Sequence, residues 1–415
     1  MKTSTTRLRN DLETNATYGS IETADGHGRT VPTGTPANRE ARDYFISRLE
    51  DAGLDVRIDR VGNVVGRWTP ETADPDAAPI ATGSHLDSVP EGGIFDGPLG
   101  VYGALEAVRA LQDAEEPLNR PVDVVSFTGE EGSRFPPLVG SSVAAGARTA
   151  NQALALTDDD GVTLEEALAD IDYIGEETLN ATEWDCWLEL HIEQGRVLER
   201  EGFSAGVVSA ITGIMQVNAS FNGEANHAGS TPMPERRDAL VAAAEFVQDV
   251  ERSANDLLTE SESLVGTVGK FDVKPGATNV VPGAVDAGID IRDVDRATMD
   301  SMAEATHESL DRIATERDVE TTAETIIDID PVAMDDRCSE ALRAGADKAG
   351  IEIGDLHSGA GHDTMHISAA TDTGMLFAQS KDGISHSPAE WTAWQNCAQA
   401  TSVLANAIAT LGRSN

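Results

Sequence analysis

Short apolar runs and helical patterns alternate along the first half of the chain. Residues 79–82, 122–127 and 187–190 are apolar runs of the length that buried strands have. Apolar positions at helical spacing predict helices over 36–52 and 99–110. The order strand, helix, strand favours an α/β sheet that is covered by helices.

The middle of the chain has a different pattern. It predicts strands at 214–221, 265–271, 285–291 and 321–329, and helices at 238–250 and 299–313. This βαββαβ order is that of the split βαβ sandwich. We therefore expect a ferredoxin-like domain, residues 213–327, inserted into a first domain of residues 1–212 and 328–415. The first domain resumes with a helix near Leu342, a strand at 375–377 and a long C-terminal helix from Glu390.

The composition is strongly acidic. The 415 residues, too many for one ordinary core, include 72 Asp and Glu against 30 Lys and Arg, a net charge of −42. Such a surface repels itself in dilute buffer and is screened in concentrated salt. Because the acidic residues are spread along the chain, we expect adaptation to a high-salt cytosol, and nucleic-acid binding is disfavoured.

The remaining composition suits a reducing compartment. Cys186, Cys338 and Cys397 lie far apart without a Cys-x-x-Cys spacing, which predicts buried thiols. The first residues are polar and lack the apolar stretch of a secretion signal, and no run approaches a membrane span. We expect a soluble, cytoplasmic protein without a membrane partner.

Polar side chains follow the strand at 79–82. His85 and Asp87 come directly after it, and Asp96 lies in the Gly/Pro-rich loop beyond. Open α/β sheets place their sites past the ends of strands. Imidazole and carboxylate together suit Zn²⁺ or a similar ion, and Asp87 is placed to orient the His85 ring. A polar loop without a metal is the alternative.

Further candidate ligands follow other strands. Glu130 and Glu131 come after the strand at 122–127, where uncompensated buried carboxylates would be costly, although adjacent acids are usually just solvated. One of them can bind metal while its neighbour acts as general base. His191 and His386 add imidazoles at two more strand ends, although a single histidine there is more often structural. Together these residues predict a dinuclear site that activates water.

This set of residues resembles the dinuclear-zinc aminoacylase and carboxypeptidase superfamily. The strings EEGSRF from Glu130, HIEQG from His191 and GAGHD from Gly359 are similar to its N-carbamoyl-L-amino-acid hydrolase and allantoate amidohydrolase branch. The resemblance covers nearly the whole chain. It implies an α/β, metallopeptidase-like catalytic domain with a mixed sheet, and an inserted ferredoxin-like domain that forms a homodimer and acts as a lid.

The resemblance also implies two divalent ions that share one carboxylate. Asp96 would bridge them, with His85 and His191 on the first ion and Glu131 and His386 on the second. Glu130 would move the proton, and Asp87 would tune His85. Zn²⁺ is the expected metal, and the mixed N/O ligands also accept Mn²⁺, Co²⁺ or Ni²⁺.

By the same resemblance, three residues of the inserted domain bind substrate. His227 would cross the dimer to stabilise the oxyanion, while Asn279 and Arg292 would hold a substrate carboxylate. Without the resemblance, we would interpret His227 as a loop histidine and Arg292 as a surface residue. In the catalytic domain, Gln194 would contact the ureido group and the backbone from Gly359 to Gly361 would line the pocket.

The other histidines receive no catalytic role. His362 and His366 form an i, i+4 pair, but the glutamate pattern of a helical zinc site is absent, so we interpret them as structural or as pocket wall. His27, His307 and His357 have no assigned role.

The leading hypothesis is hydrolysis of an N-carbamoyl-L-amino acid to the amino acid, CO₂ and NH₃. Allantoate or a β-ureido acid is the alternative substrate, because Arg292 would recognise a carboxylate in each. A dipeptidase or aminoacylase shares the ligand set, but EEGSRF, HIEQG and Arg292 argue against it. A non-catalytic metal-binding scaffold would be expected to lack Glu130.

Overall fold

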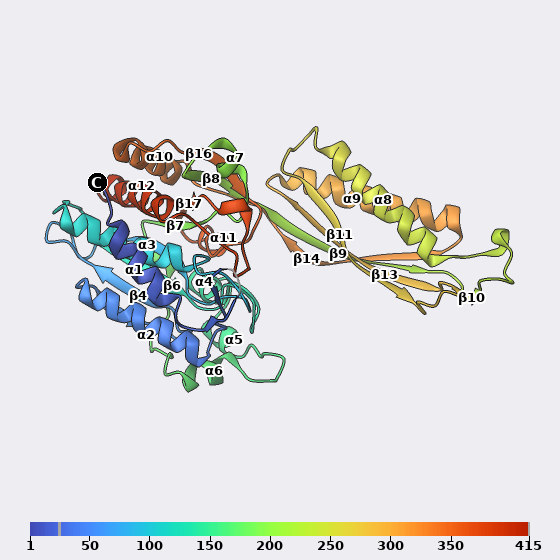
Figure 1. Ribbon diagram of the computed structural model, residues 1–415, viewed down its shortest axis with the longest axis horizontal. Coiled ribbons are helices and arrows are strands. Elements are labelled where there is room, and N and C mark those ends of the chain that lie inside the picture. Colours follow the sequence, from blue (N-terminus) through green and yellow to red (C-terminus); the bar gives the residue numbers. More distant parts are fainter. Residues whose placement is uncertain (24–25, 414–415) are drawn as a thin grey trace. The chain divides into compact units, whose positions relative to one another are not determined.

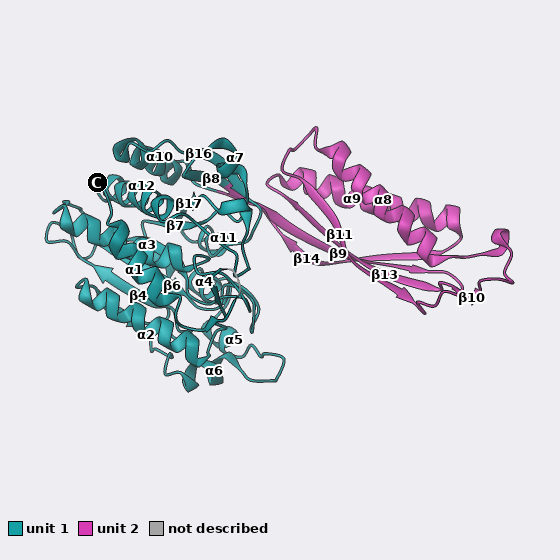
Figure 2. Ribbon diagram, viewed as in Figure 1, with its two compact units in different colours: residues 1–209, 334–415 teal, residues 210–333 magenta. Residues whose placement is uncertain are grey.

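The structure is a computed structural model and describes residues 1–23 and 26–413 (Figure 1). The chain divides into unit 1, Met1–Ser209 with Met334–Asn415, and unit 2, Ala210–Ala333 (Figure 2). Unit 2 thus begins three residues before and ends six residues after the expected 213–327. The crossing is hard to locate by pattern, because only Thr212 separates the strand that ends at Ile211 from the next one.

Unit 1 contains most of a nine-stranded mixed sheet, whose strand β15 lies in unit 2. The strand order is β15-β8-β17-β7-β5-β6-β4-β3, and β16 pairs with β8. The strands are β3 (Asp55–Ile58), β4 (Val64–Trp68), β5 (Ile80–His85), β6 (Val122–Phe127), β7 (Cys186–Ile192), β8 (Ala205–Ile211), β15 (Val332–Ala333), β16 (Gly354–Ser358) and β17 (Asp372–Ala378). The central strands β17, β7, β5 and β6 are parallel, so their carboxyl ends lie at one edge. A separate hairpin pairs β1 (Ser20–Ile21) with β2 (Gly28–Arg29).

Helices cover both faces of this sheet (Figure 1). They are α1 (Thr5–Asn15), α2 (Pro36–Asp51), α3 (Pro98–Asp113), α4 (Val139–Ala144), α5 (Ala150–Leu154), α6 (Leu164–Asp170), α7 (Val197–Glu201), α10 (Asp336–Ala349), α11 (Thr364–Ile367) and α12 (Trp394–Gly412). The larger core, with α3 and α12, contains Val122 and Val124. The smaller core, with Ile367 of α11, contains Val125 and Phe127, so successive β6 side chains serve opposite faces.

The C-terminal helix differs from expectation. It begins at Trp394 rather than at Glu390. The segment before it is irregular, because the Glu390 side chain turns inward and accepts hydrogen bonds from the backbone N–H groups of Phe95 and Asp96. Glu390 is therefore a buried loop residue and not the start of a helix.

Unit 2 has the βαββαβ order that the pattern predicts. Its elements are β9 (Gly213–Asn222), α8 (Ala239–Leu257), β11 (Val265–Lys274), β13 (Ala284–Asp293), α9 (Arg296–Arg317) and β14 (Glu320–Ile329). The sheet order is β11-β13-β9-β14, antiparallel throughout. One face buries alternate residues of β9 and β13 against the two helices, as Phe221 does against Phe246. A short pair joins β10 (Asn226–His227) to β12 (Val280–Val281).

Two other features concern the cysteines and the apolar length of the helices. Cys186, Cys338 and Cys397 are free and buried. Within the described ranges, no helix is both long and apolar enough to cross a bilayer.

Candidate metal centre

The candidate ligands gather at the carboxyl edge of the central strands. His85 is the last residue of β5, His191 lies near the end of β7, and Glu130 and Glu131 follow β6. The parallel register pairs His85 with Phe127 of β6, so these strand ends are neighbours. Asp96 enters from the loop between β5 and α3.

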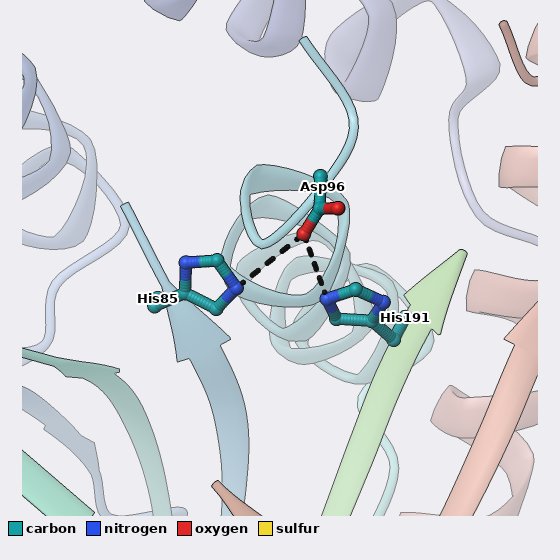
Figure 3. Close-up of side chains that lie close together, drawn as sticks. All are labelled: His85, Asp96 and His191. Atoms are coloured by element: carbon teal, nitrogen blue, oxygen red, sulfur yellow. Dashed lines mark ion pairs between the residues drawn. The ribbon is translucent and has the colours of Figure 1, made fainter. Parts of the chain in front are cut away.

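The first ligand group consists of His85, Asp96 and His191 (Figure 3). The Nε2 atoms of His85 and His191 lie 3.6 and 3.2 Å from Asp96 Oδ1. Each Nδ1 faces a backbone carbonyl, that of Asp87 at 3.2 Å and that of Ile192 at 3.1 Å. When Nδ1–H donates to those carbonyls, both Nε2 lone pairs point toward the Asp96 carboxylate, which is the arrangement of metal-binding imidazoles.

The second ligand group consists of Asp96, Glu131 and His386. His386 Nε2 lies 3.4 Å from Asp96 Oδ2 and 3.3 Å from Glu131 Oε2. Asp96 therefore presents one oxygen to each group. In each group the potential ligand atoms all lie within 4.8 Å of one another.

The donor set fits two divalent cations. His85 Nε2 and Glu131 Oε1 are buried and have no hydrogen-bond partner among the described residues. Burial, together with the nearby Asp96 carboxylate, raises the pKa of Glu131 to about 7, and the Asp96 contact raises the pKa of His386 to about 9. With these raised pKa values, Glu131 and His386 retain protons that a divalent ion bound between the ligands would displace. The mixed N/O ligands suit Zn²⁺ and similar divalent ions.

Glu130 stands beside the ligands but belongs to neither group. Its Oε2 lies 3.7 Å from His85 Nε2. Burial raises the pKa of this carboxyl well above its ordinary value, although the nearby His85 opposes the shift. A carboxylate held next to the ligands without a cation of its own suits proton transfer.

Asp87 contacts the His85 ring, as expected of a residue that tunes it, and it also bonds a second strand-end segment. Its carboxylate Oδ1 lies 3.7 Å from His85 Nδ1, and its backbone carbonyl is the closer partner of that ring. The two carboxylate oxygens face the backbone N–H groups of Glu130 and Glu131, each at 3.3 Å. Asp87 therefore fixes the strand-end segment that carries both glutamates.

Gln194 contacts the ligands. Its Nε2 donates to Asp96 Oδ2 at 2.8 Å and to Ser385 Oγ at 3.1 Å. Ser385 Oγ in turn lies 2.7 Å from Asp96 Oδ2. The expected contact of Gln194 with a ureido group stays a prediction.

The loop around Gly359 and Gly361 lies next to the first ligand group. Ser358 at the end of β16 bonds Ala360 and the Nε2 of His362. The His362 ring packs edge-on against His191, with ring centroids 4.6 Å apart. Neither His362 nor His366 belongs to a ligand group within residues 1–23 and 26–413.

The three residues expected to bind substrate from unit 2 occupy its two ends. His227 is exposed on β10 and pairs with Val280, and the carbonyl of Asn279 accepts from Ala228. Arg292 lies near the far end of β13, where its guanidinium bonds the Asp290 carboxylate at 2.8 and 3.4 Å.

His227 is held in one tautomer. The backbone N–H groups of Gly229 and Ser230 both point at its Nδ1, at 3.0 and 3.1 Å. Nδ1 is therefore an acceptor, so the proton of the neutral ring is on Nε2. The exposed ring presents a donor.

Comparison with known proteins gives the chain a family. The profile of "Peptidase family M20/M25/M40" matches residues 81–410. The chain belongs to this family. An N-carbamoyl-L-amino acid amidohydrolase of Geobacillus stearothermophilus is 38% identical over 94% of this chain and 95% of that protein.

Other relatives of this M20-family chain extend the comparison. A ureidoglycolate hydrolase of Oryza sativa subsp. japonica is 35% identical over 90% of the chain and 78% of that protein. A crystal structure of a hydantoinase/carbamoylase family amidase from Burkholderia multivorans has 38% identity and a TM-score of 0.94, covering 100% of this chain and 99% of that one. The mixed α/β fold of this chain is thus that of the family.

Proposed function

We propose that this M20-family chain cleaves the linear amide C–N bond of an N-carbamoyl-L-amino acid, releasing the amino acid, CO₂ and NH₃. The observation that carries the proposal is the pair of ligand groups sharing Asp96, with Glu130 beside them. The relatives named N-carbamoyl-L-amino acid amidohydrolase support the choice of substrate.

The proposed chemistry divides between the ions and the chain. Two divalent ions, when bound, would polarise the substrate carbonyl and lower the pKa of water. Glu130 would take a proton from the attacking water as its oxygen bonds the carbamoyl carbon, and would give that proton to the nitrogen as the C–N bond breaks. The protonated NH₂ nitrogen leaves as NH₃, and the N-carboxy amino acid that remains loses CO₂ to give the free amino acid. The Nε2–H of His227 would donate to the oxyanion.

We propose that the protein works as a homodimer. His227 pairs with Val280, before β13 begins at Ala284, whereas Arg292 lies eight positions further along that strand. At the rise of a strand, Ala284 and Arg292 are about 27 Å apart. Because that distance exceeds the length of a carbamoyl amino acid, His227 and Arg292 of one protomer would serve different sites. In such a dimer, each protomer would contribute its His227 and Asn279 to the site that holds Arg292 of the other protomer.

The edges of unit 2 offer a surface for such a dimer. The outer strands β11 and β14 are the two edges of the sheet. Phe271 on β11 and Ile326 on β14 are exposed, at 38% and 50%. Exposed apolar edge strands are sites of association between chains.

The proposal extends to the identity of the metal ion and to the salt concentration in which the protein works. Zn²⁺ is our choice of ion, and Mn²⁺, Co²⁺ or Ni²⁺ are the alternatives, since no cysteine lies in either ligand group. The net charge of −42 supports a cytosol of high salt concentration.

A substrate panel tests the reaction. Ammonia release would be followed at high salt with added metal, using N-carbamoyl-L-amino acids, allantoate, ureidoglycolate, β-ureidopropionate and dipeptides. We expect the highest kcat/KM for a carbamoyl amino acid. A ureido acid is the second candidate, because relatives named ureidoglycolate hydrolase and allantoate deiminase are 35% and 36% identical. Preference for dipeptides would overturn the assignment.

Adjacent glutamates provide a matched pair of variants. Glu130→Gln should retain bound metal and lose about 10²- to 10⁴-fold in kcat, because it removes only the proton carrier. Glu131→Gln should lose metal from the second ligand group, because it removes a ligand. Normal turnover by Glu130→Gln would refute the mechanism.

A further inference from the structure

The Asp96 loop and the His386 loop have little regular structure of their own. Asp96 lies between β5 and α3, and His386 lies between β17 and α12, in a left-handed conformation with φ of +52°. These two residues belong to the second ligand group, but 290 positions separate them in the chain. Something other than a strand or helix must hold the two loops in register.

Glu390 connects them. It is 1% exposed and lies four residues after His386. Its Oε1 accepts from the backbone N–H groups of Phe95 at 2.9 Å and Asp96 at 3.1 Å. Two amides that converge on one carboxylate oxygen fix the backbone at the residue that bridges both ligand groups.

The other oxygen of Glu390 reaches the Asp96 side chain through a hydroxyl. Ser385 Oγ lies 3.1 Å from Glu390 Oε2 and 2.7 Å from Asp96 Oδ2. Glu390 is thus linked to both the backbone and the carboxylate of Asp96. The hydroxyl that completes this link comes from the residue just before His386.

The fit around Glu390 is close. A Cβ atom at position 93 would lie 2.1 Å from the Glu390 carboxyl carbon, so glycine is required there. Phe95 also packs against Trp391 and Trp394, with ring centroids 5.4 and 5.1 Å apart. The two loops therefore meet in a built interface rather than a chance contact.

We propose that Glu390 is a positioning residue that holds the Asp96 and His386 loops together and so sets the affinity of the second ligand group for its metal ion. The inference rests on the dinuclear centre of the proposed function. It requires no contact between Glu390 and substrate, and no change in the protonation of Glu390.

Metal titration of the folded chain tests this role. Co²⁺ would be added to metal-free protein and followed by visible absorbance and calorimetry. We expect Glu390→Ala to bind the second Co²⁺ about 10- to 100-fold more weakly. The first Co²⁺ should be weakened by a smaller factor, because His85 and His191 stay fixed on their strands. Glu390→Gln should restore the second site, because its amide oxygen can still accept both backbone bonds and its NH₂ can donate to Ser385. Ser385→Ala should weaken the second site alone.

A matched control removes a buried glutamate elsewhere. Glu106 on α3 is also buried and accepts the backbone N–H of Ser4 at 2.7 Å, beside Arg7. Glu106→Ala should lower stability but leave both Co²⁺ affinities unchanged. Equal Co²⁺ binding by wild type, Glu390→Ala and Ser385→Ala would overturn the inference alone. A wild-type protein that binds no Co²⁺ would overturn the proposed function as well.

Discussion

The Asp87 carboxylate lies 3.3 Å from the backbone nitrogen of Glu130, and its second oxygen lies at the same distance from that of Glu131. Through its carbonyl, the same residue faces Nδ1 of His85. One buried aspartate thus contacts His85, a candidate ligand on β5, and the backbone of the two glutamates that follow β6. Because Asp87 lies just past the end of β5, it connects the ends of strands β5 and β6.

Loss of the Asp87 carboxylate should reduce catalysis more than stability. We expect Asp87→Ala to lower kcat about 10- to 100-fold, because Glu130 and Glu131 lose their fixed backbone. Asp59 is a matched control, since it is also buried and accepts the backbone N–H groups of Val61 and Asn63. Asp59→Ala should lower the melting temperature and keep kcat within a small factor. Equal loss of kcat in both variants would contradict a specific role.

His227 provides a test of the dimer. His227→Ala alone should lower kcat about 10²- to 10³-fold, because a donor to the oxyanion is lost. When inactive His227→Ala and Glu130→Ala proteins are mixed and allowed to exchange subunits, half of the dimers are hybrids with one complete site each. Activity should return to about a quarter of the wild-type level if His227 acts across a two-fold interface. A mixture that stays inactive after exchange, shown by differently tagged subunits, would mean that His227 acts within its own protomer.

Much of the fold could be predicted because local pattern decided it. The strands β5, β6 and β7 are apolar runs buried on both faces, so their periodicity was visible without knowledge of their neighbours. His85, His191, Glu130 and Glu131 follow from the same pattern, since they lie at or just beyond the ends of those strands. The pairing of these residues into two ligand groups came from resemblance rather than from spacing.

Residues whose partners are distant in sequence escaped prediction. Glu390 is separated by 295 positions from the Phe95 amide that it binds, and nothing local distinguishes a buried acid from the many solvated ones. Arg29 was assigned no role from the sequence, yet it is fully buried and donates to the carbonyl of Leu86, beside His85. A glycine pair before Asp96 was the available signal for Glu390, because Gly93 leaves room for its carboxyl group.

The acidic surface predicts a response to salt. Raising KCl from about 0.1 M to about 1 M shortens the Debye length from about 10 Å to about 3 Å and weakens repulsion among the acidic side chains. We expect the melting temperature of the protein, with a net charge of −42, to rise over this range. Sucrose at matched osmolarity is the control, since it does not screen charge. A melting temperature that is flat or falls with KCl would contradict adaptation to high salt.

Unit 2 should lose stability in acid through an ion pair between its helices, in which Asp249 is buried and Arg312 is partly exposed. Asp249 on α8 accepts hydrogen bonds from Ser309 and Arg312 on α9. Burial raises the pKa of Asp249, but these bonds outweigh it and leave the pKa below its ordinary value. Because the folded pKa is the lower one, the contribution is present above the unfolded pKa, about 3.9, and disappears as pH falls through the folded value.

Asp249→Asn should therefore change how the free energy of unfolding depends on pH in the acid range. Near neutral pH we expect it to lower the free energy of unfolding by about 1 to 3 kcal/mol, because a charged hydrogen-bond acceptor is replaced by an amide. Below about pH 4 the urea midpoints of the variant and the wild type should converge, since the wild-type carboxylate is then being protonated as well. Asp256→Asn removes an equal charge at an exposed position of the same helix. A plot of its urea midpoint against pH should run parallel to that of the wild type. Parallel curves for both variants would show that the Asp249 pair is not linked to protonation.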